Sequence, residues 1–275
     1  MITVNLIYPE QSDIPFKAII FPDGQPHIKM DTMAAQAVPP ATPLRILARL
    51  ANASDLLMVL FVKNTLDYLE FQHVELHISY LLAARMDRVM LDGEPFSLKV
   101  IAQILNGGRF AKVRIFDPHS EVSTALIDRS YAVSNHAFVA AALAEYRQEN
   151  VCLVSPDAGA LKKIHKLAAY LGATEVVECM KERDLRTGAL TNFKTMAENL
   201  EGRTCVIVDD ICDGGGTFAG TASMLKTKGA WKVALVVSHG IFSRGPVIEG
   251  VDRIYTTDSY RLVEGVTTFP VGDYL

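Results

Sequence analysis

The sequence has no long hydrophobic run, no tract of basic residues and no targeting signal at its amino terminus. The apolar stretch at residues 56–62 is far too short to cross a bilayer, so we expect a cytoplasmic protein with no membrane partner. Lys and Arg number 27 against 31 Asp and Glu, which gives a formal charge of −4 and argues against a nucleic-acid partner. Any anionic ligand must therefore be bound by a local arrangement of residues.

Cysteine is also scarce, and its spacing excludes the common cysteine-based sites. The four cysteines follow no CxxC or Cys/His pattern, and the first three lie in apolar, strand-like surroundings. We therefore favour buried free thiols over disulfides or a zinc site for Cys152, Cys179, Cys205 and Cys212.

Short apolar segments bounded by Pro, Gly, Asn or Asp dominate the first half of the chain, and such segments are typical of β-strands. Helices are expected at 64–72, capped by Asn64, and at 97–106, where the apolar residues recur at helical spacing. We expect strands at 3–8, 17–21, 45–51, 55–62, 73–80 and 112–117.

The second half begins near residue 135 with a helix over 134–150, capped by Ser134 or Asn135. Continuous apolar strands then alternate with helices, which predicts a parallel sheet covered on both faces. At 275 residues the chain is long enough for two α/β domains, predicted here as 1–135 and 136–275. Residues 183–202 are polar and weakly periodic, so we expect an exposed excursion there.

The stretch "IVDDICDGGGTF" at 207–218 combines acidic residues with three glycines. It joins a buried strand to a helix, at the edge of a parallel sheet where α/β folds bind ligands. Gly214, Gly215 and Gly216 allow backbone amides to converge on a phosphate, and Thr217 adds a hydroxyl at the start of the helix.

The acidic residues of the stretch require a ligand with more than a phosphate. Carboxylates accept hydrogen bonds from vicinal hydroxyls, so a sugar phosphate such as ribose 5-phosphate would present its diol to Asp209 and Asp210, with Asp213 beside the loop. Neither GxGxxG nor GxxxxGK[ST] occurs, which excludes a Rossmann or P-loop site. The alternative is a glycine-rich turn with solvated acids.

This stretch resembles the phosphoribosyl diphosphate binding motif that type I phosphoribosyltransferases share with ribose-phosphate pyrophosphokinases. Further stretches resemble the pyrophosphokinases in order and spacing: "FPDGQ" at 21–25, "ARMDRVMLDGEPFS" at 84–97, "DPHS" at 117–120, "SPDAGALKK" at 155–163 and "SHGIFSRGP" at 238–246. The resemblance implies two tandem phosphoribosyltransferase-like domains, each with a mainly parallel sheet flanked by helices. It also implies a Mg²⁺-dependent enzyme with ATP and ribose 5-phosphate as substrates, which assembles as a homo-oligomer, either a dimer or a hexamer.

The resemblance assigns roles to individual residues. It places Phe21 against the adenine, Arg85 against the ATP phosphates, and Lys181 and Arg183 on a mobile catalytic loop. His119 and Asp157 would lie near Mg²⁺, although a structural histidine and an ordinary helix cap are their simpler interpretations. The remaining residues implied at the ATP site are Asp23, Gln25, Met86 and Asp87, and those implied in the pyrophosphate loop are Ala158 and Gly159.

Departures from the family pattern concern both the nucleotide site and the carboxyl end. Met86 stands where the family has glutamine, and Gln25 stands where it commonly has glutamate. The chain also stops after "FPVGDYL", whereas the family usually continues through a helix that returns to the first domain, so regulation and assembly are expected to differ. The alternatives to an active pyrophosphokinase are a non-catalytic regulatory homologue and a phosphoribosyltransferase.

Overall fold

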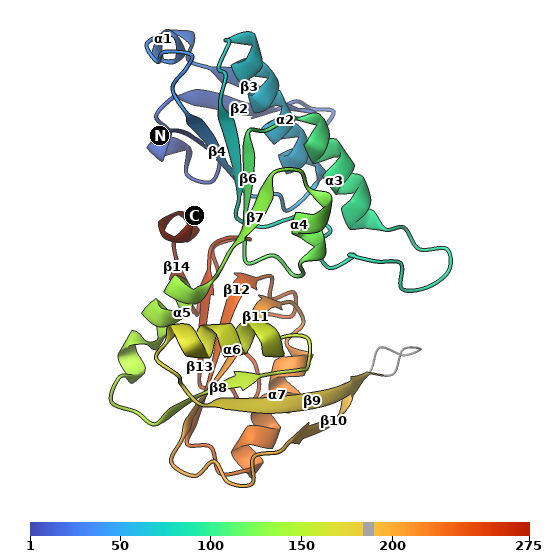
Figure 1. Ribbon diagram of the computed structural model, residues 1–275, viewed down its shortest axis with the longest axis vertical. Coiled ribbons are helices and arrows are strands. Elements are labelled where there is room, and N and C mark those ends of the chain that lie inside the picture. Colours follow the sequence, from blue (N-terminus) through green and yellow to red (C-terminus); the bar gives the residue numbers. More distant parts are fainter. Residues whose placement is uncertain (184–189) are drawn as a thin grey trace. The chain divides into compact units, whose positions relative to one another are not determined.

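The structure is a computed structural model that describes residues 1–183 and 190–275, with the backbone alone described at 181–183 and 190–192. The chain forms two compact units (Figure 1). Unit 1 comprises Met1–Ser134 together with Leu275, and unit 2 comprises Asn135–Tyr274.

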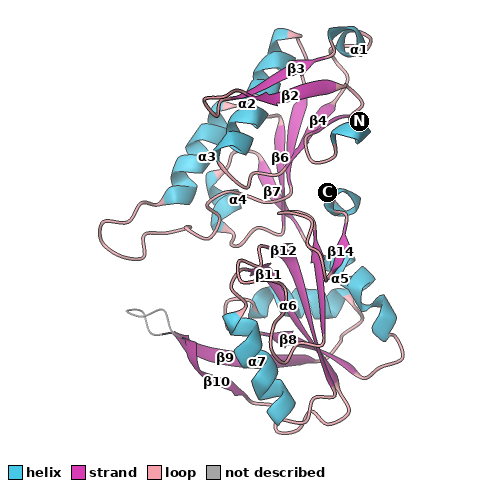
Figure 2. Ribbon diagram, turned by 180° about the vertical axis from the view of Figure 1, so that it is seen from behind, coloured by secondary structure: helices cyan, strands magenta, loops and turns pink. Residues whose placement is uncertain are grey.

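Unit 1 is built on a parallel five-stranded sheet with the strand order β1-β4-β5-β6-β7. A separate antiparallel hairpin is formed by β2 and β3. Figures 1 and 2 show α2, α3 and α4 gathered on one side of the five strands. The elements are β1 (Ile2–Asn5), β2 (Phe16–Ile20), β3 (Pro26–Met30), α1 (Thr32–Gln36), β4 (Leu44–Ala48), α2 (Ala53–Tyr68), β5 (Val74–Ile78), α3 (Ser97–Gly107), β6 (Lys112–Phe116), α4 (Val122–Leu126) and β7 (Ser130–Val133), with a 3₁₀ turn at Pro9–Gln11.

The prediction of a strand at 55–62 is wrong, because these residues lie within α2. Asn52 and Asp55 form a capping box at its start, with the Asn52 side chain bonded to the Asp55 amide and the Asp55 carboxylate bonded to the Asn52 amide. The helix continues through Asn64, which is therefore no cap. Its buried residues, among them Val59, Val62 and Leu66, recur at helical spacing, but the apolar residues between them hide this period in the sequence.

The two faces of the five-stranded sheet differ in chemistry because alternate side chains of a strand point to opposite sides. One face carries apolar residues such as Val4, Ile46 and Leu76, which belong to the buried core of the unit. The other face carries a row of directly paired polar residues, with Thr3 opposite Arg45 and Arg45 opposite Glu75. The sheet therefore has one apolar face and one polar face.

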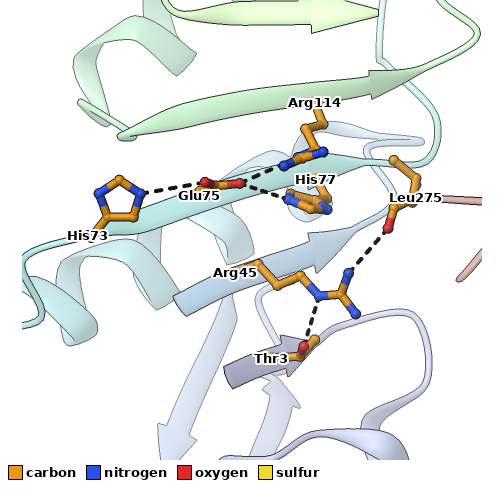
Figure 3. A network of polar contacts seen from close by, with 7 residues as sticks. All are labelled: Thr3, Arg45, His73, Glu75, His77, Arg114 and Leu275. Carbon is orange, nitrogen blue, oxygen red and sulfur yellow. Dashed lines mark hydrogen bonds and ion pairs between the residues drawn. The ribbon is translucent and has the colours of Figure 1, made fainter. Parts of the chain in front are cut away.

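Figure 3 shows the contacts on the polar face. Glu75 is buried, and its two carboxylate oxygens lie 3.2 Å from Nε2 of His77, 3.5 Å from Nε2 of His73 and 3.4 Å from Nε of Arg114. Arg45 donates from Nε to Oγ1 of Thr3 over 2.8 Å and from Nη1 to the backbone oxygen of Leu275 over 3.2 Å. The buried carboxylate is thus surrounded by hydrogen-bond donors.

Burial shifts the pKa values of Glu75 and His77 in opposite directions. Burial alone would raise the pKa of Glu75, but the hydrogen bonds from His77 and His73 and the charge of Arg114 outweigh it, and the pKa ends below its usual value. Burial lowers the pKa of His77, and the charges of Arg114 and Arg45 lower it further, against the opposing effect of Glu75. His77 is therefore neutral in the folded protein at neutral pH, and its buried Nδ1 has no hydrogen-bond partner among the described residues.

We expect the free energy of unfolding to fall as the pH is lowered below 6.5, the usual pKa of histidine. The unfolded chain takes up a proton on His77 in this range and the folded chain does not. The free energy of unfolding therefore falls by up to about 1.4 kcal/mol for each unit by which the pKa of His77 differs between the two states. Thermal melts between pH 7.5 and 5 should show that His77→Asn flattens this dependence. His165→Asn, at an exposed histidine paired with Glu178, is the control and should follow the parent curve; a His77→Asn curve as steep as the parent would contradict the assignment.

Unit 2 contains a seven-stranded sheet with the order β10-β9-β8-β11-β12-β13-β14. All of its pairs are parallel except β9 with β10. In Figure 1 α6 lies in front of the strands, and in the reverse view of Figure 2 α7 lies in front, so the sheet has helices on both faces. The elements are α5 (His136–Ala142), β8 (Val151–Ser155), α6 (Leu161–Tyr170), β9 (Val176–Arg183), β10 (Leu190–Thr195), β11 (Thr204–Cys212), α7 (Gly216–Thr227), β12 (Lys232–Gly240), β13 (Arg253–Thr257) and β14 (Thr267–Phe269), with 3₁₀ turns at Leu143–Tyr146 and Val271–Tyr274.

Three local predictions for unit 2 need correction. The helix expected over 134–150 is shorter, since α5 ends at Ala142 and a 3₁₀ turn follows. Residues 190–195 of the expected excursion form β10, which pairs with β9 in an antiparallel hairpin, because pairing with an existing strand stabilises a segment of low intrinsic periodicity. Asn135 precedes α5, but its side chain makes no capping hydrogen bond and instead donates from Nδ2 to Oγ of Ser238 over 3.1 Å. The four cysteines are all buried free thiols, as predicted.

Candidate functional site

The glycine-rich stretch forms the turn between β11 and α7, where the sequence analysis placed it. Gly215 precedes the helix with a φ of +77°, a left-handed conformation that favours glycine. A Cβ on Gly215 would also lie 3.2 Å from the side chain of Ile248, which packs against the turn. The amides of Gly214 and Gly216 flank this position, and both residues are exposed. The backbone donors of the turn and of the start of the three-turn helix α7 are therefore accessible to an anion from the same side.

The acids lie at the end of β11, on the same sheet edge. Asp210 is buried and Asp209 half-buried, and the Asp209 carboxylate accepts a hydrogen bond of 2.9 Å from the Asp210 amide. Loss of hydration raises the pKa of Asp209 well above its usual value, and the neighbouring charges of Asp210 and Asp157 raise it further. A cation or a hydrogen-bond donor next to the carboxylates would reduce this repulsion. The hydroxyls of a polyol are such donors.

Asp157 is brought close to these acids by strand pairing, because β8 and β11 are parallel neighbours and their carboxyl ends meet. Its Oδ1 accepts from the Ala160 amide over 3.1 Å, and its backbone oxygen accepts from Oγ of Ser155 over 2.8 Å. These bonds shape the turn before α6, while Ala158 and Gly159 remain exposed. Asp157 therefore both stabilises this turn and lies near Asp209 at the carboxyl end of the strands.

Lys181 and Arg183 lie on the last residues of β9, so their backbone belongs to the β9–β10 hairpin. Their side chains lie outside the described part of the structure, as do residues 184–189. The catalytic role of the pair stays a prediction.

In unit 1, "FPDGQ" is the tight turn of the β2–β3 hairpin. The Phe21 amide donates to the Gln25 oxygen over 2.9 Å, and the Asp23 carboxylate accepts from the Gln25 amide over 3.0 Å. Gly24 has a φ of +84°, as such a turn requires. Phe21 is 41 % exposed, and the centroid of its ring lies 5.5 Å from that of His27. The residue is therefore accessible for stacking.

The other predicted nucleotide residues of unit 1 lie in two loops. Arg85 is exposed, and Met86 and Asp87 are half-buried in the segment that leads to α3, where the Met86 oxygen accepts from the Leu98 amide over 3.2 Å. His119 is exposed just after β6. Nothing in these contacts assigns a nucleotide to either loop.

A family model described as "Phosphoribosyl transferase domain" matches residues 128–270, which is more than half of the chain. The chain belongs to this family. The ribose-phosphate pyrophosphokinase of Pyrococcus abyssi is 27% identical over 263 residues, which cover 93% of this chain and 87% of the relative. That of Corynebacterium glutamicum is 30% identical over 186 residues, which cover 64% of this chain and 56% of the relative. The resemblance to the pyrophosphokinases is thereby confirmed.

The crystal structure of phosphoribosylpyrophosphate synthetase from Mycobacterium smegmatis superimposes with a TM-score of 0.79. The match covers 96% of this chain and 89% of the other, at 20% sequence identity. The predicted α/β fold with mainly parallel sheets flanked by helices is therefore confirmed for this member of the phosphoribosyl transferase domain family.

Sequence reasoning missed one residue at the glycine-rich turn of this phosphoribosyl transferase domain. Arg244 follows β12, and its side chain lies against Gly214. Thirty positions separate the two residues in the chain, so only the pairing of β11 with β12 brings them together. The stretch "SHGIFSRGP" was among those that resemble the pyrophosphokinases, but it assigned no role to Arg244, and a basic residue in a loop is by itself an ordinary surface feature.

The part of the chain that the structure describes contains neither a preformed metal site nor a helix that could span a membrane. Among residues 1–183 and 190–275, no three His, Cys, Asp or Glu residues are grouped so that they could hold a metal ion. The same residues include no helix that is long and apolar enough to cross a bilayer.

Proposed function

We propose that the protein transfers the diphosphoryl group of ATP to the anomeric hydroxyl of ribose 5-phosphate and releases AMP. The observation that carries the proposal is the end of β11, where two carboxylates lie directly beside a left-handed glycine turn and the start of α7. A pyranose or furanose phosphate needs both groups, since its phosphate accepts hydrogen bonds and its hydroxyls donate them. The names of the relatives, ribose-phosphate pyrophosphokinase, favour ribose 5-phosphate among such ligands.

In this proposal the amides of residues 214–216 and the Thr217 hydroxyl bind the 5-phosphate, and Asp209 and Asp210 accept hydrogen bonds from the ribose diol, with Asp213 beside the loop. The anomeric oxygen attacks the β-phosphorus of ATP, the bond from that phosphorus to the α,β-bridging oxygen breaks, and AMP leaves while the hydroxyl proton passes to solvent. Lys181 and Arg183 stabilise the negative charge that develops on the transferred group. Asp157, Ala158 and Gly159 line the position of the diphosphate.

The nucleotide residues proposed in unit 1 act by ordinary recognition chemistry. Phe21 stacks on the adenine, Asp23 and Gln25 approach its edge, and Arg85 binds the phosphates with Met86 and Asp87 alongside. Each of these assignments rests on the matching motif.

Magnesium fits the donors that the chain provides. The ion prefers oxygen ligands, keeps several waters and commonly binds through one or two protein groups together with substrate phosphates. Asp157 supplies a carboxylate, and His119 is proposed beside the ATP phosphates. When bound, the ion would neutralise charge on the transferred diphosphoryl group. We also propose that the enzyme acts in the cytoplasm as a homo-oligomer.

The purified protein with ATP, ribose 5-phosphate and Mg²⁺ should release AMP and form phosphoribosyl diphosphate in equal amounts. Omission of the sugar phosphate, or chelation of the metal, should reduce AMP release to the rate without enzyme. AMP release that is no faster with ribose 5-phosphate than without it would contradict the proposal and favour a regulatory homologue. Consumption of phosphoribosyl diphosphate on addition of a nucleobase would favour a phosphoribosyltransferase.

A further inference from the structure

A tight turn at residues 241–245 is held against the entry to the glycine-rich loop. The Cys212 oxygen accepts hydrogen bonds from the amides of Ile241, at 2.9 Å, and Phe242, at 3.1 Å. The Asp213 oxygen accepts from the Ser243 amide over 3.2 Å. Three backbone hydrogen bonds thus tie this turn to the two residues that precede Gly214.

The turn is also fixed from its other sides. Phe242 is only 2 % exposed and packs in the core of unit 2 with Cys212 and Ile248. The Arg261 guanidinium donates to the backbone oxygens of Ile241 and Phe242. The turn closes through a 3.0 Å bond from the Gly245 amide to the Phe242 oxygen. A segment held by core packing and by hydrogen bonds on two sides presents its remaining side chains at defined positions.

Arg244 is one of these side chains, and it lies beside Gly214 of the glycine-rich turn. A Cβ placed on Gly214 would be 3.7 Å from both Cδ and Nε of Arg244. Arg244 is exposed, and its guanidinium has no hydrogen bond or ion pair within residues 1–183 and 190–275. Its five N–H donors are therefore available beside the loop amides.

The glycine-rich loop is acidic, so a positive charge such as that of Arg244 beside it would favour the binding of a phosphate. Residues 207–218 contain three carboxylates and no Lys or Arg, while a phosphomonoester brings close to two further negative charges at neutral pH. The start of α7 offsets only about half a unit charge. A full positive charge next to Gly214 reduces the repulsion between the phosphate and Asp213, and guanidinium geometry suits bidentate binding of phosphate oxygens.

We propose that Arg244 is a phosphate-binding residue of the sugar phosphate site and contacts the 5-phosphate beside the loop amides. This inference rests on the proposed function, because it takes the β11–α7 turn as the 5-phosphate site. Arg244 sets the preference for a phosphorylated sugar over a free one, while the acids at the end of β11 bind the hydroxyls of either.

The test measures binding and rate separately. Calorimetric titration of the full-length protein with ribose 5-phosphate and with ribose should show that Arg244→Ala reduces the preference for the phosphorylated sugar about tenfold, the loss of one exposed charge-assisted contact. Steady-state assays should show KM for ribose 5-phosphate rising by about the same factor, with KM for ATP unchanged. Arg244→Lys should retain part of the preference, since it keeps the charge but loses the bidentate geometry.

The matched control is Arg253→Ala. Arg253 is an exposed arginine of the same unit, at the start of β13 and so at the other end of the sheet, and it has no side-chain partner within the described residues. This variant should bind ribose 5-phosphate like the parent. Equal binding by the parent and Arg244→Ala would overturn the role of Arg244 and leave the proposed function standing, as would a loss confined to ATP. Failure of the parent protein to bind ribose 5-phosphate would overturn both.

Discussion

Replacement of Lys181 or Arg183 by Ala should lower kcat roughly 10²-fold or more and change KM much less. The negative charge on the transferred diphosphoryl group is expected to be greatest in the transition state. Cations such as Lys181 and Arg183 that interact with this charge would therefore stabilise the transition state more than the bound substrates. Both residues lie at the end of β9, where the β9–β10 hairpin meets the segment outside the described residues.

Lys194→Ala provides the control for this pair. Lys194 is exposed on β10, directly opposite Met180 of β9. Its replacement by Ala removes one cation from the same hairpin and leaves Lys181 and Arg183 unchanged. Its kcat should remain within a factor of about two of the parent, as for most surface substitutions. Single-turnover measurement of AMP release would separate the chemical step from product release. Unchanged kcat in both Ala variants would show that Lys181 and Arg183 are surface residues only.

Replacement of Asp210 by Asn should raise the dissociation constant for ribose 5-phosphate by roughly 10- to 100-fold, the range expected for a hydrogen bond to a charged acceptor. Asp210 is only 8 % exposed, so bulk water competes weakly with a ligand hydroxyl for its carboxylate. Asp209→Asn should have a smaller effect, because the Asp209 carboxylate already accepts a hydrogen bond from the Asp210 amide and the Asn side chain keeps an oxygen that can accept it.

Comparing the binding of ribose with that of ribose 5-phosphate distinguishes a contact with the sugar hydroxyls from a general loss of folded structure. Both Asn variants should weaken the binding of free ribose by the same factor as that of ribose 5-phosphate, whereas Arg244→Ala should weaken only the phosphorylated ligand. Glu198→Gln alters an exposed carboxylate before the start of β11, at the opposite end of that strand from the acids, and should leave both constants unchanged. A normal affinity of Asp210→Asn for ribose would exclude the diol contact.

Segments with one dominant local signal were predicted correctly. Strands β5 and β6 and helix α3 lie where the apolar spacing and the bounding residues placed them. The helix at 53–68 was mistaken for a strand followed by a helix, because a run that is apolar at almost every position has no distinct period. Strand β10 was missed because its stability depends on pairing with β9 rather than on its own residues.

By itself, the sequence determined that a strand, two acids, a glycine turn and a helix follow one another at 204–227, since each step depends on near neighbours in the chain. Only the tertiary structure decided which distant residues join them. Pairing of β8 with β11 brings Asp157 to the acids, and pairing of β11 with β12 sets Arg244 against Gly214. Such contacts depend on the order and register of parallel strands, which arise from burial of the whole sheet and leave no local pattern in any one segment.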